Sequence, residues 1–420
     1  MNAIHPFPAP AASSPAAPGP VPVLAERATP AHRIASDAEA IETARALALV
    51  FAREASERDR EGRLPLAEVE AFSQSGLWAI TVPKDYGGAG VSAVTLAEVI
   101  AIISAADPNL GQIPQNHFYL VEALRLDATE AQKRFFFSRV LAGDRFGNAL
   151  SERDAKRQGQ IATTVLPEGA GHVVNGRKFY STGALFAHWI VVTALNSAGK
   201  RVLVFLPRGA QGLTLVNDWA SFGQRTTASG TTSFDNVRAT DFEIVPHYQA
   251  FERPTPMGAV AQIMHGAIEV GIARGALAET VAFVRTHSRP WADSGREHAW
   301  EDPYVISDIG DIRVRIRAAE ALQRRAGRII DEAFLDPEAR SVDASIAVAE
   351  LKVAATEAAL HAANKLFELS GTRSTLTSLN LDRYWRNSRT HTLHDPVRWK
   401  YHVVGNYWLN GVAPPRHGAV

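Results

Sequence analysis

The residues best suited to chemistry lie close together near the end of the chain. His391 and His394 are three residues apart, and Asp395 and Pro396 follow directly. Because histidine titrates near neutral pH, such a pair can donate and accept protons. Pro396 favours an extended or turn conformation at the residue before it, which would place both histidines at the end of one element. Aromatic residues on both sides of the segment indicate that it borders a cavity rather than open solvent.

Two histidines at this spacing are also compatible with different roles. They could ligate a metal ion, but only Asp395 is near enough to be a third ligand. They could instead be ordinary, satisfied histidines that cap the preceding helix. A serine hydrolase would use His394 with Ser151 or Ser181, but the chain has no Gly-x-Ser-x-Gly sequence to present such a serine.

Composition narrows the class of protein. The chain has 420 residues, of which 46% are hydrophobic and 21% charged, and its formal net charge is zero. These values are typical of a globular protein of two or three domains. No basic stripe indicates binding to nucleic acid, and no apolar run approaches the roughly 20 residues that span a bilayer. The absence of cysteine excludes disulfides and thiolate chemistry. We expect the protein to be located in the cytoplasm.

The chain divides into four segments by composition and periodicity. Residues 1–34 are rich in alanine and proline and predict a disordered tail, without a signal peptide. Residues 35–143 predict an N-terminal helical domain, and residues 144–250 predict a middle β domain. Residues 251–420 predict a C-terminal helical bundle domain.

Local patterns within these segments predict individual elements. In the β segment, Asn175-Gly176 is a strong turn signal and predicts a hairpin within residues 173–180. Strands at 189–194 and 201–206 are expected to form a second pair. Helices are expected at residues 93–106, 130–142, 257–287, 303–334 and 342–369.

This order of elements resembles the acyl-CoA dehydrogenase superfamily over about residues 36–415. The resemblance is carried by the sequences at 86–90, 175–178, 234–237 and 271–277. The sequences at 219–226 and 391–396 resemble more closely the branch that holds dibenzothiophene monooxygenase and the sulfur-acquisition oxidoreductases. The resemblance implies an α+β fold with an N-terminal helical domain, a middle β-barrel domain and a C-terminal four-helix bundle.

One departure from true dehydrogenases bears on the reaction. An acyl-CoA dehydrogenase removes a proton with a glutamate beside its flavin, but no glutamate follows Glu368 in this chain. The second position used in some relatives falls near Ala261 and Gln262, and the nearby Glu269 is expected on the helix surface or in an ion pair. Without a positioned carboxylate, proton abstraction has no evident agent. An FAD-dependent acyl-CoA dehydrogenase and a catalytically silent binding protein remain the alternatives.

The resemblance instead implies a two-component flavin-dependent monooxygenase. A separate NAD(P)H-dependent reductase would supply reduced FMN, with FAD as the alternative. A flavin C4a-hydroperoxide would then pass one oxygen to a small organosulfur compound, in the service of sulfur acquisition. The resemblance also implies a homotetramer, and we expect no metal, nucleic acid or membrane partner.

The resemblance further implies roles for individual residues. His391 and His394 would be the catalytic histidines, with His394 closest to the flavin, and Ser181 and Thr182 would lie beside it. Arg289 would reach the flavin phosphate across a subunit interface. The other expected cofactor contacts are Asn116, Asn148, Ala149, Leu150, Ser151, Glu152, Arg153, Lys178, Phe179, Tyr180, Thr372 and Arg373.

The substrate pocket is expected to be lined by Gln112, His117 and Trp219. Gln112 and Asn116 stand where the dibenzothiophene enzyme has a histidine and a tyrosine, which favours a small polar sulfone or sulfoxide over a large thiophene. Judged alone, several of these residues could have simpler roles. Trp219 could belong to the core, and Arg289 could only stack on a neighbouring ring.

Overall fold

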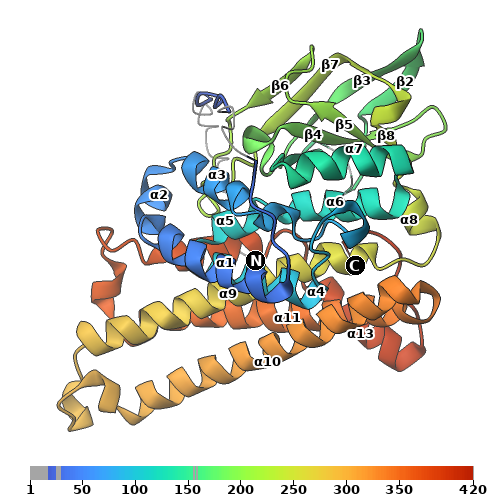
Figure 1. Ribbon diagram of the computed structural model, residues 1–420. Helices are drawn as coiled ribbons and strands as arrows, with labels where there is room; N and C mark the ends of the chain where they lie inside the picture. The colour runs from blue at the N-terminus through green and yellow to red at the C-terminus, as the bar shows by residue number, and fades with distance from the viewer. Residues whose placement is uncertain (1–17, 25–29, 155–156, 158, 420) are drawn as a thin grey trace, which may run out of the picture.

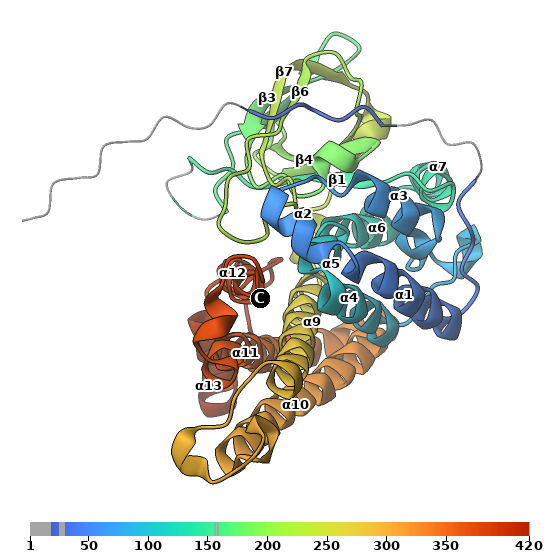
Figure 2. The ribbon, with the colours of Figure 1, turned by 90° about the vertical axis from the view of Figure 1, so that its left-hand side faces the viewer.

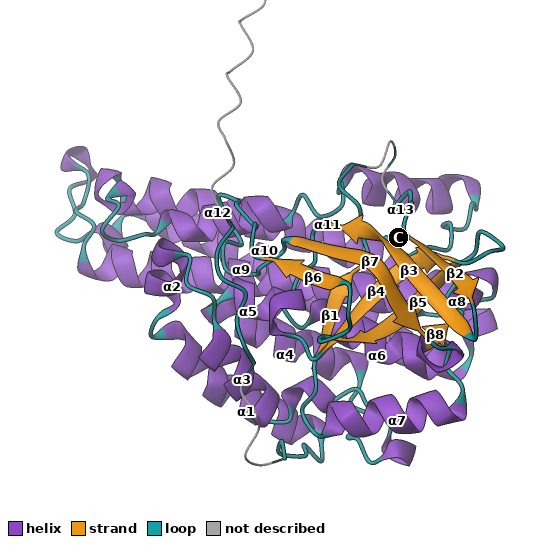
Figure 3. Ribbon diagram, turned by 90° about the horizontal axis from the view of Figure 1, so that it is seen from above, coloured by secondary structure: helices purple, strands orange, loops and turns teal. Residues whose placement is uncertain are grey.

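The computed structural model describes residues 18–24, 30–154, 157 and 159–419. Helices come first along the chain, then a β sheet, and then a bundle of long helices (Figure 1). Viewed from above, the sheet lies over one end of the helical layer, and the long helices extend well past it (Figure 3). No described helix is long and apolar enough to cross a membrane.

The first part of the chain is helical, as expected, and both helices predicted there are confirmed. Its α-helices are α1 (Asp37–Ala52), α2 (Ala55–Glu61), α3 (Leu66–Gln74), α4 (Ala93–Ala106), α5 (Pro108–Gln112), α6 (Gln115–Asp127) and α7 (Glu130–Leu141). Local caps fix where they begin: the Ser92 side chain accepts from Thr95 N at the start of α4, and the Asp107 side chain accepts from Asn109 N at the start of α5.

The middle of the chain forms one sheet. Its strands are β1 (Phe146–Ala149), β2 (Thr164–Glu168), β3 (Gly171–Lys178), β4 (Trp189–Leu195), β5 (Arg201–Pro207), β6 (Leu213–Val216), β7 (Thr231–Ala239) and β8 (Ile244–Val245). The order is β6-β7-β3-β2-β4-β5-β8, and β1 pairs with β4 in parallel. The predicted β4–β5 pair is confirmed. The end strands β6 and β8 are not paired with each other in the described sheet, so its detailed form is open rather than a closed barrel.

The hairpin predicted at Asn175-Gly176 is wrong. Strand β3 runs straight through these residues, and the hairpin turn lies earlier, between β2 and β3. The register of β3 against β7 shifts between Val174 and Gly176. A side chain at Gly176 would collide with Thr163, so the glycine is required by close packing at a bulge rather than by a turn.

The last part of the chain is a helical bundle. After the short α8 (Gln249–Glu252), its helices are α9 (Met257–Thr286), α10 (Pro303–Leu335), α11 (Pro337–Ser370), α12 (Asp382–His391) and α13 (Arg398–Asn410). The three long helices predicted from the sequence are α9, α10 and α11. Helix α9 is central, because it packs against α11, α4 and α10. Helix α13 packs on α11 and completes a bundle of four.

The expected disordered tail is wrong for the part that the structure describes. Gly19 N donates to Asn217 O at 2.8 Å, and Arg208 donates to Pro22 O at 2.9 Å, so residues 18–24 lie against the sheet. His32 N donates to Gln74 O, and Ile34 is 5% exposed. Backbone groups of a proline-rich segment can therefore pair with a folded surface without forming a regular element. The remaining tail residues lie outside the described part of the chain.

Candidate active site

Two loops of the β domain meet where β1 and β3 end. Asn148 N donates to Thr182 O at 3.3 Å, and the Asn148 side chain donates to Tyr180 O at 3.1 Å. Phe179 N donates to Ser151 O at 3.0 Å. Ser181 and Thr182 are buried. The structure therefore brings together the residues at 148–151 and 178–182 that the sequence suggested as cofactor contacts.

A third loop, residues 219–230, closes over this junction. Ser181 N donates to Gly230 O, and the hydroxyls of Thr182 and Ser229 are 2.7 Å apart. The Trp219 ring lies 6.1 Å from the ring of Tyr180. Trp219 is therefore neither isolated nor part of the hydrophobic core, and it stands beside the expected cofactor loop.

The backbone and polar atoms of these loops are unusual. In the described chain, three of the five non-glycine residues with positive φ lie here: Tyr180, Gln224 and Ala228. Several buried side-chain atoms at the same place have no hydrogen-bond partner: Ser181 Oγ, Thr226 Oγ1 and both polar atoms of the Gln224 amide. Strained backbone and unpaired buried polar groups are typical of ligand sites. Neutral donors and acceptors of this kind fit the polar heteroaromatic ring of a flavin.

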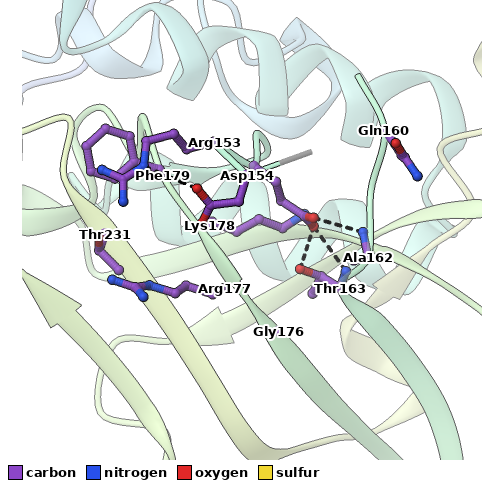
Figure 4. A pocket seen from close by; sticks show the side chains of 11 residues that line it. Arg153, Asp154, Gln160, Ala162, Thr163, Gly176, Arg177, Lys178, Phe179 and Thr231 are labelled. Atoms are coloured by element: carbon purple, nitrogen blue, oxygen red, sulfur yellow. Dashed lines mark hydrogen bonds and ion pairs between the residues drawn. The ribbon is translucent and has the colours of Figure 1, made fainter. Parts of the chain in front are cut away.

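A cavity of about 460 Å³ opens beside these loops (Figure 4), a volume within the usual range of small-molecule sites. Four of the expected cofactor contacts line it: Glu152, Arg153, Lys178 and Phe179. The Arg153 guanidinium lies 4.5 Å from the Phe179 ring centre, and Lys178 donates to Glu152 at 2.8 Å.

Electrostatics at this cavity are set by the Lys178–Glu152 pair. Burial alone would raise the pKa of Glu152, but hydrogen bonds from Lys178, Thr163 and Ala162 lower it to about 2. Burial lowers the pKa of Lys178 to about 8, against the opposing effect of Glu152. The cavity contains none of the histidines, so it is one side of the site and not the place of proton transfer.

The histidines gather where α12 meets α9. His391 is the last residue of α12, and its side chain is fully buried. His391 Nδ1 lies 3.0 Å from Glu269 Oε1, and its Nε2 lies 3.2 Å from His265 Nδ1. The ring of His394 stacks on His265 with centroids 3.9 Å apart, and His394 Nδ1 lies 3.2 Å from Asp395 Oδ1. His394 differs from the others in being 45% exposed at its side chain, so it is the histidine that a ligand can reach.

Two buried ion pairs flank the three histidines. Glu269 pairs with Lys352 of α11, and both side chains are fully buried. Asp395 lies 3.2 Å from Lys400 of α13. Burial alone would raise the pKa of each carboxylate, but nearby cations and histidines outweigh it and lower both pKa values. Burial lowers the pKa values of His391, Lys400 and, most strongly, His265.

The histidines and the β-domain loops are joined by direct contacts. Gln224 N donates to Asn387 Oδ1 at 2.7 Å, and Arg386 donates to Phe222 O at 2.8 Å. Asn387 precedes His391 by one helical turn, about 6 Å. Figure 2 shows α12 on the side of the bundle that faces the sheet. The loop at 219–230 and helix α12 therefore connect the two groups of expected residues where the sheet meets the bundle.

The expected phosphate contacts lie elsewhere in the single chain. Arg289 follows the far end of α9, and Thr372 and Arg373 follow the end of α11. A hydrogen bond from Ser288 to Leu369 O places these two loops side by side. They are about 30 Å along α9 from the histidines. Within one chain these residues do not meet the rest of the site.

The three expected pocket residues are placed differently. Gln112 ends α5, and its Oε1 is buried without a partner. The adjacent Ile113 O is in close approach to Gly183, which follows Thr182. His117, by contrast, is fully buried, with its ring nitrogens bonded to Trp78 O and Phe146 N. The geometry thus favours a pocket role for Gln112 and not for His117.

Sequence reasoning missed much of the histidine environment. His265 and Lys352 were not suggested by any motif. Glu269 was expected on the helix surface or in an ion pair; the ion pair is present, but the surface position is wrong because Glu269 has no exposed area. A histidine and a glutamate four residues apart in the otherwise apolar stretch 257–273 were an available signal. In the described part of the chain, no group of three or more histidine, aspartate and glutamate residues could hold a metal ion.

Comparison with known proteins defines the family. Models of the acyl-CoA dehydrogenase family match three parts of the chain: the N-terminal domain at residues 37–144, the middle domain at 147–237 and the C-terminal domain at 263–399. The chain belongs to the acyl-CoA dehydrogenase family. The expected fold is therefore confirmed.

Particular relatives narrow this further. A dibenzothiophene monooxygenase of Rhodococcus qingshengii is 34% identical over 400 residues, which cover 91% of this chain and 96% of the relative. FMN-bound TdsC of Paenibacillus sp. A11-2, a dibenzothiophene monooxygenase, has a TM-score of 0.87 at 32% identity and covers 91% of this chain and 100% of its own. Methanesulfinate monooxygenase MsuC of Pseudomonas fluorescens has a TM-score of 0.84 at 32% identity, with coverages of 90% and 99%. The chain is similar to flavin-dependent monooxygenases rather than only to dehydrogenases.

Proposed function

We propose that this protein is the oxygenase of a two-component flavin-dependent system and transfers one oxygen atom to a small organosulfur compound. The observation that carries the proposal is the half-exposed His394, held by Asp395 and stacked on His265, just past the end of α12, whose Asn387 is bonded to the loop at 219–230. A monooxygenase needs a proton donor beside its flavin. The resemblance to TdsC and MsuC supports the same reaction.

The alternative, an acyl-CoA dehydrogenase, lacks its base in this site. Glu269 is the carboxylate nearest to the histidines on α9, but Lys352, Thr356 and His391 all bind it. A carboxylate that is fully buried and fully hydrogen-bonded cannot accept a proton from a substrate without breaking those bonds. The site is therefore equipped to deliver protons and not to remove one from carbon.

The residues of the chain would divide the work. Bound reduced FMN would supply two electrons to O2, so that one oxygen atom enters the organosulfur substrate (at sulfur in a sulfoxide or sulfinate) and the other leaves as water. Asp395 accepts from His394 Nδ1, which leaves His394 Nε2 to hold a proton toward the ligand. Ser181 and Thr182 would bind the flavin ring, and Trp219 would exclude water from one side.

The substrate is proposed to be small and polar, such as a sulfone, a sulfoxide or a sulfinate. Identity does not decide this, because the relatives that act on dibenzothiophene and on methanesulfinate are equally similar to this chain. The support comes from Gln112 and Asn116, which carry amides rather than rings. The amide nitrogens can donate to the oxygen of a polar sulfur–oxygen group, whereas a large thiophene would leave them unpaired.

Three further features belong to the proposal. A separate NAD(P)H-dependent reductase supplies the reduced flavin, and the enzyme works in the cytoplasm. It assembles as a homotetramer, which is supported by the position of Arg289, Thr372 and Arg373 far from the rest of the site. Trp291 and Tyr304, at the same end of the bundle, are 71% and 81% exposed. A second copy that covers this end would bring the arginines to the flavin phosphate.

The test is to supply the protein with photoreduced FMN or FAD and to follow oxygen consumption and sulfur products. We expect turnover of small sulfones, sulfoxides or sulfinates to exceed that of dibenzothiophene, and FMN to work better than FAD. Faster turnover of dibenzothiophene would reject the small substrate. A protein that is purified yellow and is bleached by an acyl-CoA would reject the monooxygenase altogether.

A further inference from the structure

A continuous line of polar contacts runs from the centre of the bundle to the reactive histidine. Lys352 donates to Glu269 Oε1, which lies 3.0 Å from His391 Nδ1. His391 Nε2 lies 3.2 Å from His265 Nδ1, and the His265 ring stacks on His394. Four elements contribute: α9, α11, α12 and the turn that follows α12. The proposed function uses only the exposed end of this line.

The contacts determine which nitrogen of each ring carries hydrogen. An ionised carboxylate can only accept, so His391 must donate to Glu269 from Nδ1. A neutral His391 then has a lone pair on Nε2, and His265 must donate to it from Nδ1. His394 faces the carboxylate of Asp395 with its Nδ1 and must donate there too. All three rings are thereby specified as Nδ1-protonated.

Charge places the exchangeable proton on one ring only. The two flanking ion pairs are each neutral as a pair, so they leave no charge to balance a second imidazolium. His265 and His394 have ring centroids 3.9 Å apart, and two like charges at that distance oppose each other. The charged groups around them are Asp395, Lys400, Glu269 and Lys352, and His391 is the remaining titratable neighbour. Burial disfavours the charge on His265 and His391, whereas the His394 side chain is 45% exposed, so that water can reach it.

We propose that Glu269 and Lys352 are positioning residues that hold His391 and His265 as neutral Nδ1-protonated rings, so that the site delivers a single proton, from His394. This inference rests on the proposed function for the use of that proton, but not for the state of the rings. Lys352 keeps Glu269 ionised and fixed, and neither residue touches a ligand. A purely structural ion pair would affect only the stability of the fold. This pair also determines which ring nitrogen of His391, and through it of His265, carries the hydrogen atom.

Solid-state ¹⁵N NMR of the intact protein labelled at histidine tests the ring states without any flavin. Protonated and unprotonated ring nitrogens have separate signals, and His391 and His265 are assigned by their loss in His391→Gln and His265→Gln. We expect both rings to show a protonated Nδ1 and an unprotonated Nε2 from pH 6 to 8. An Nε2-protonated or doubly protonated His391 in the unmodified protein would overturn the proposal, and this result needs no variant that might fail to fold.

The double variant Glu269→Gln with Lys352→Met tests the positioning role. It removes both charges of the pair together, so it leaves no uncompensated buried charge. We expect mixed tautomers at His391 and a kcat that is about 10- to 100-fold lower, with KM changed by less than about 3-fold. The pH dependence of kcat should also change its shape. An unchanged spectrum, or an unchanged kcat and pH profile, would overturn the role.

A matched control is Glu320→Gln, which also removes a buried carboxylate of the bundle. Glu320, on α10, is 3% exposed and accepts a hydrogen bond from Arg274 at 2.8 Å. Arg274 lies about one and a half turns along α9 from Glu269. This variant should lower the melting temperature and leave the histidine spectrum and the pH profile as they were. If the unmodified protein oxygenates no sulfur compound, the proposed function fails, while the NMR spectrum still decides the states of the rings.

Discussion

The two sides of the site are built from different types of polar group. Around Ser181, Thr182 and the loop at 219–230, the β-domain side uses neutral hydroxyls, amides and left-handed backbone, with polar atoms such as Ser181 Oγ left unpaired. Its buried ion pair, Lys178–Glu152, lines the adjacent cavity. The bundle side uses buried charges, each in an ion pair, around three histidines. Unpaired neutral groups are ready to receive a ligand, whereas paired buried charges keep a proton in a defined place. In the proposed function, the first side would bind the ligand and the second would carry out proton transfer.

The strongest way to break this comparison is to replace His394. We expect His394→Gln to lower kcat about 10²- to 10⁴-fold, because a positioned proton donor contributes that much to catalysis. The melting temperature should change little, since the side chain is 45% exposed. The control is His402→Gln on α13, an exposed histidine that lies against Trp399, which should keep full activity. Equal losses in both variants would show that His394 has no special role.

Removing one partner of the buried pair should affect stability most. Lys352→Met leaves the carboxylate of Glu269 buried without its cation, and we expect the free energy of unfolding to fall by about 3–5 kcal/mol. The double variant with Glu269→Gln should recover most of this loss. Urea unfolding measures both. A single variant as stable as the parent would mean that the charges are not held as the structure shows.

On the β-domain side, we expect Ser181→Ala to weaken flavin binding and to leave the stability of the protein nearly unchanged. The Ser181 hydroxyl has no partner to lose, so stability should stay within about 0.5 kcal/mol, while the flavin Kd rises about 5- to 10-fold through a lost hydrogen bond. Ser73→Ala is the matched control, because Ser73 is equally buried but donates to Gly143 O at 2.6 Å. It should lose stability and keep its flavin affinity. Unchanged flavin binding in Ser181→Ala would remove this loop from the cofactor site.

The smallest expected effect concerns acid stability at the cavity. The folded pKa of Glu152 is about 2 and its ordinary value is 4.5, so its contribution is present above about pH 4.5 and is lost as the pH falls towards 2. Lys178, with a folded pKa of about 8, stays protonated across this range. Calorimetry from pH 6 to 2.5 should therefore show a shallower fall in melting temperature for Glu152→Gln. If the melting temperatures of Glu152→Gln and of the unmodified protein fell equally steeply with pH, the Glu152–Lys178 ion pair would be contradicted.

Periodicity predicted what depends on local sequence. The apolar repeats at 93–106 and in the three long helices predicted α4, α9, α10 and α11, because a buried helix face repeats along its own chain. The Asn-Gly turn at 175–176 failed because packing against Thr163 outweighed a local preference. The motif at 391–396 also placed two histidines correctly at the end of a helix.

The rest of the site depends on contacts that are distant in sequence. Glu269, Lys352 and His391 lie on three different helices. No spacing in the sequence could therefore show that Lys352 and His391 both contact the carboxylate of Glu269. The same holds for the loop at 219–230, whose contacts with Ser181 and Asn387 join the two sides. His117 illustrates the opposite error, a residue wrongly included in the site. It was expected to line the pocket because its residue type matches that of the relatives, but both of its ring nitrogens are hydrogen-bonded to backbone groups in the core.

The most direct measurement is the fate of isotopically labelled oxygen. The protein is mixed with chemically reduced FMN, ¹⁸O2 and a small sulfoxide or sulfinate, and the product is analysed by mass spectrometry. One ¹⁸O atom in each product molecule, and its loss in His394→Gln, is the predicted result. A product without label, or no product while an acyl-CoA is oxidised, would contradict the account.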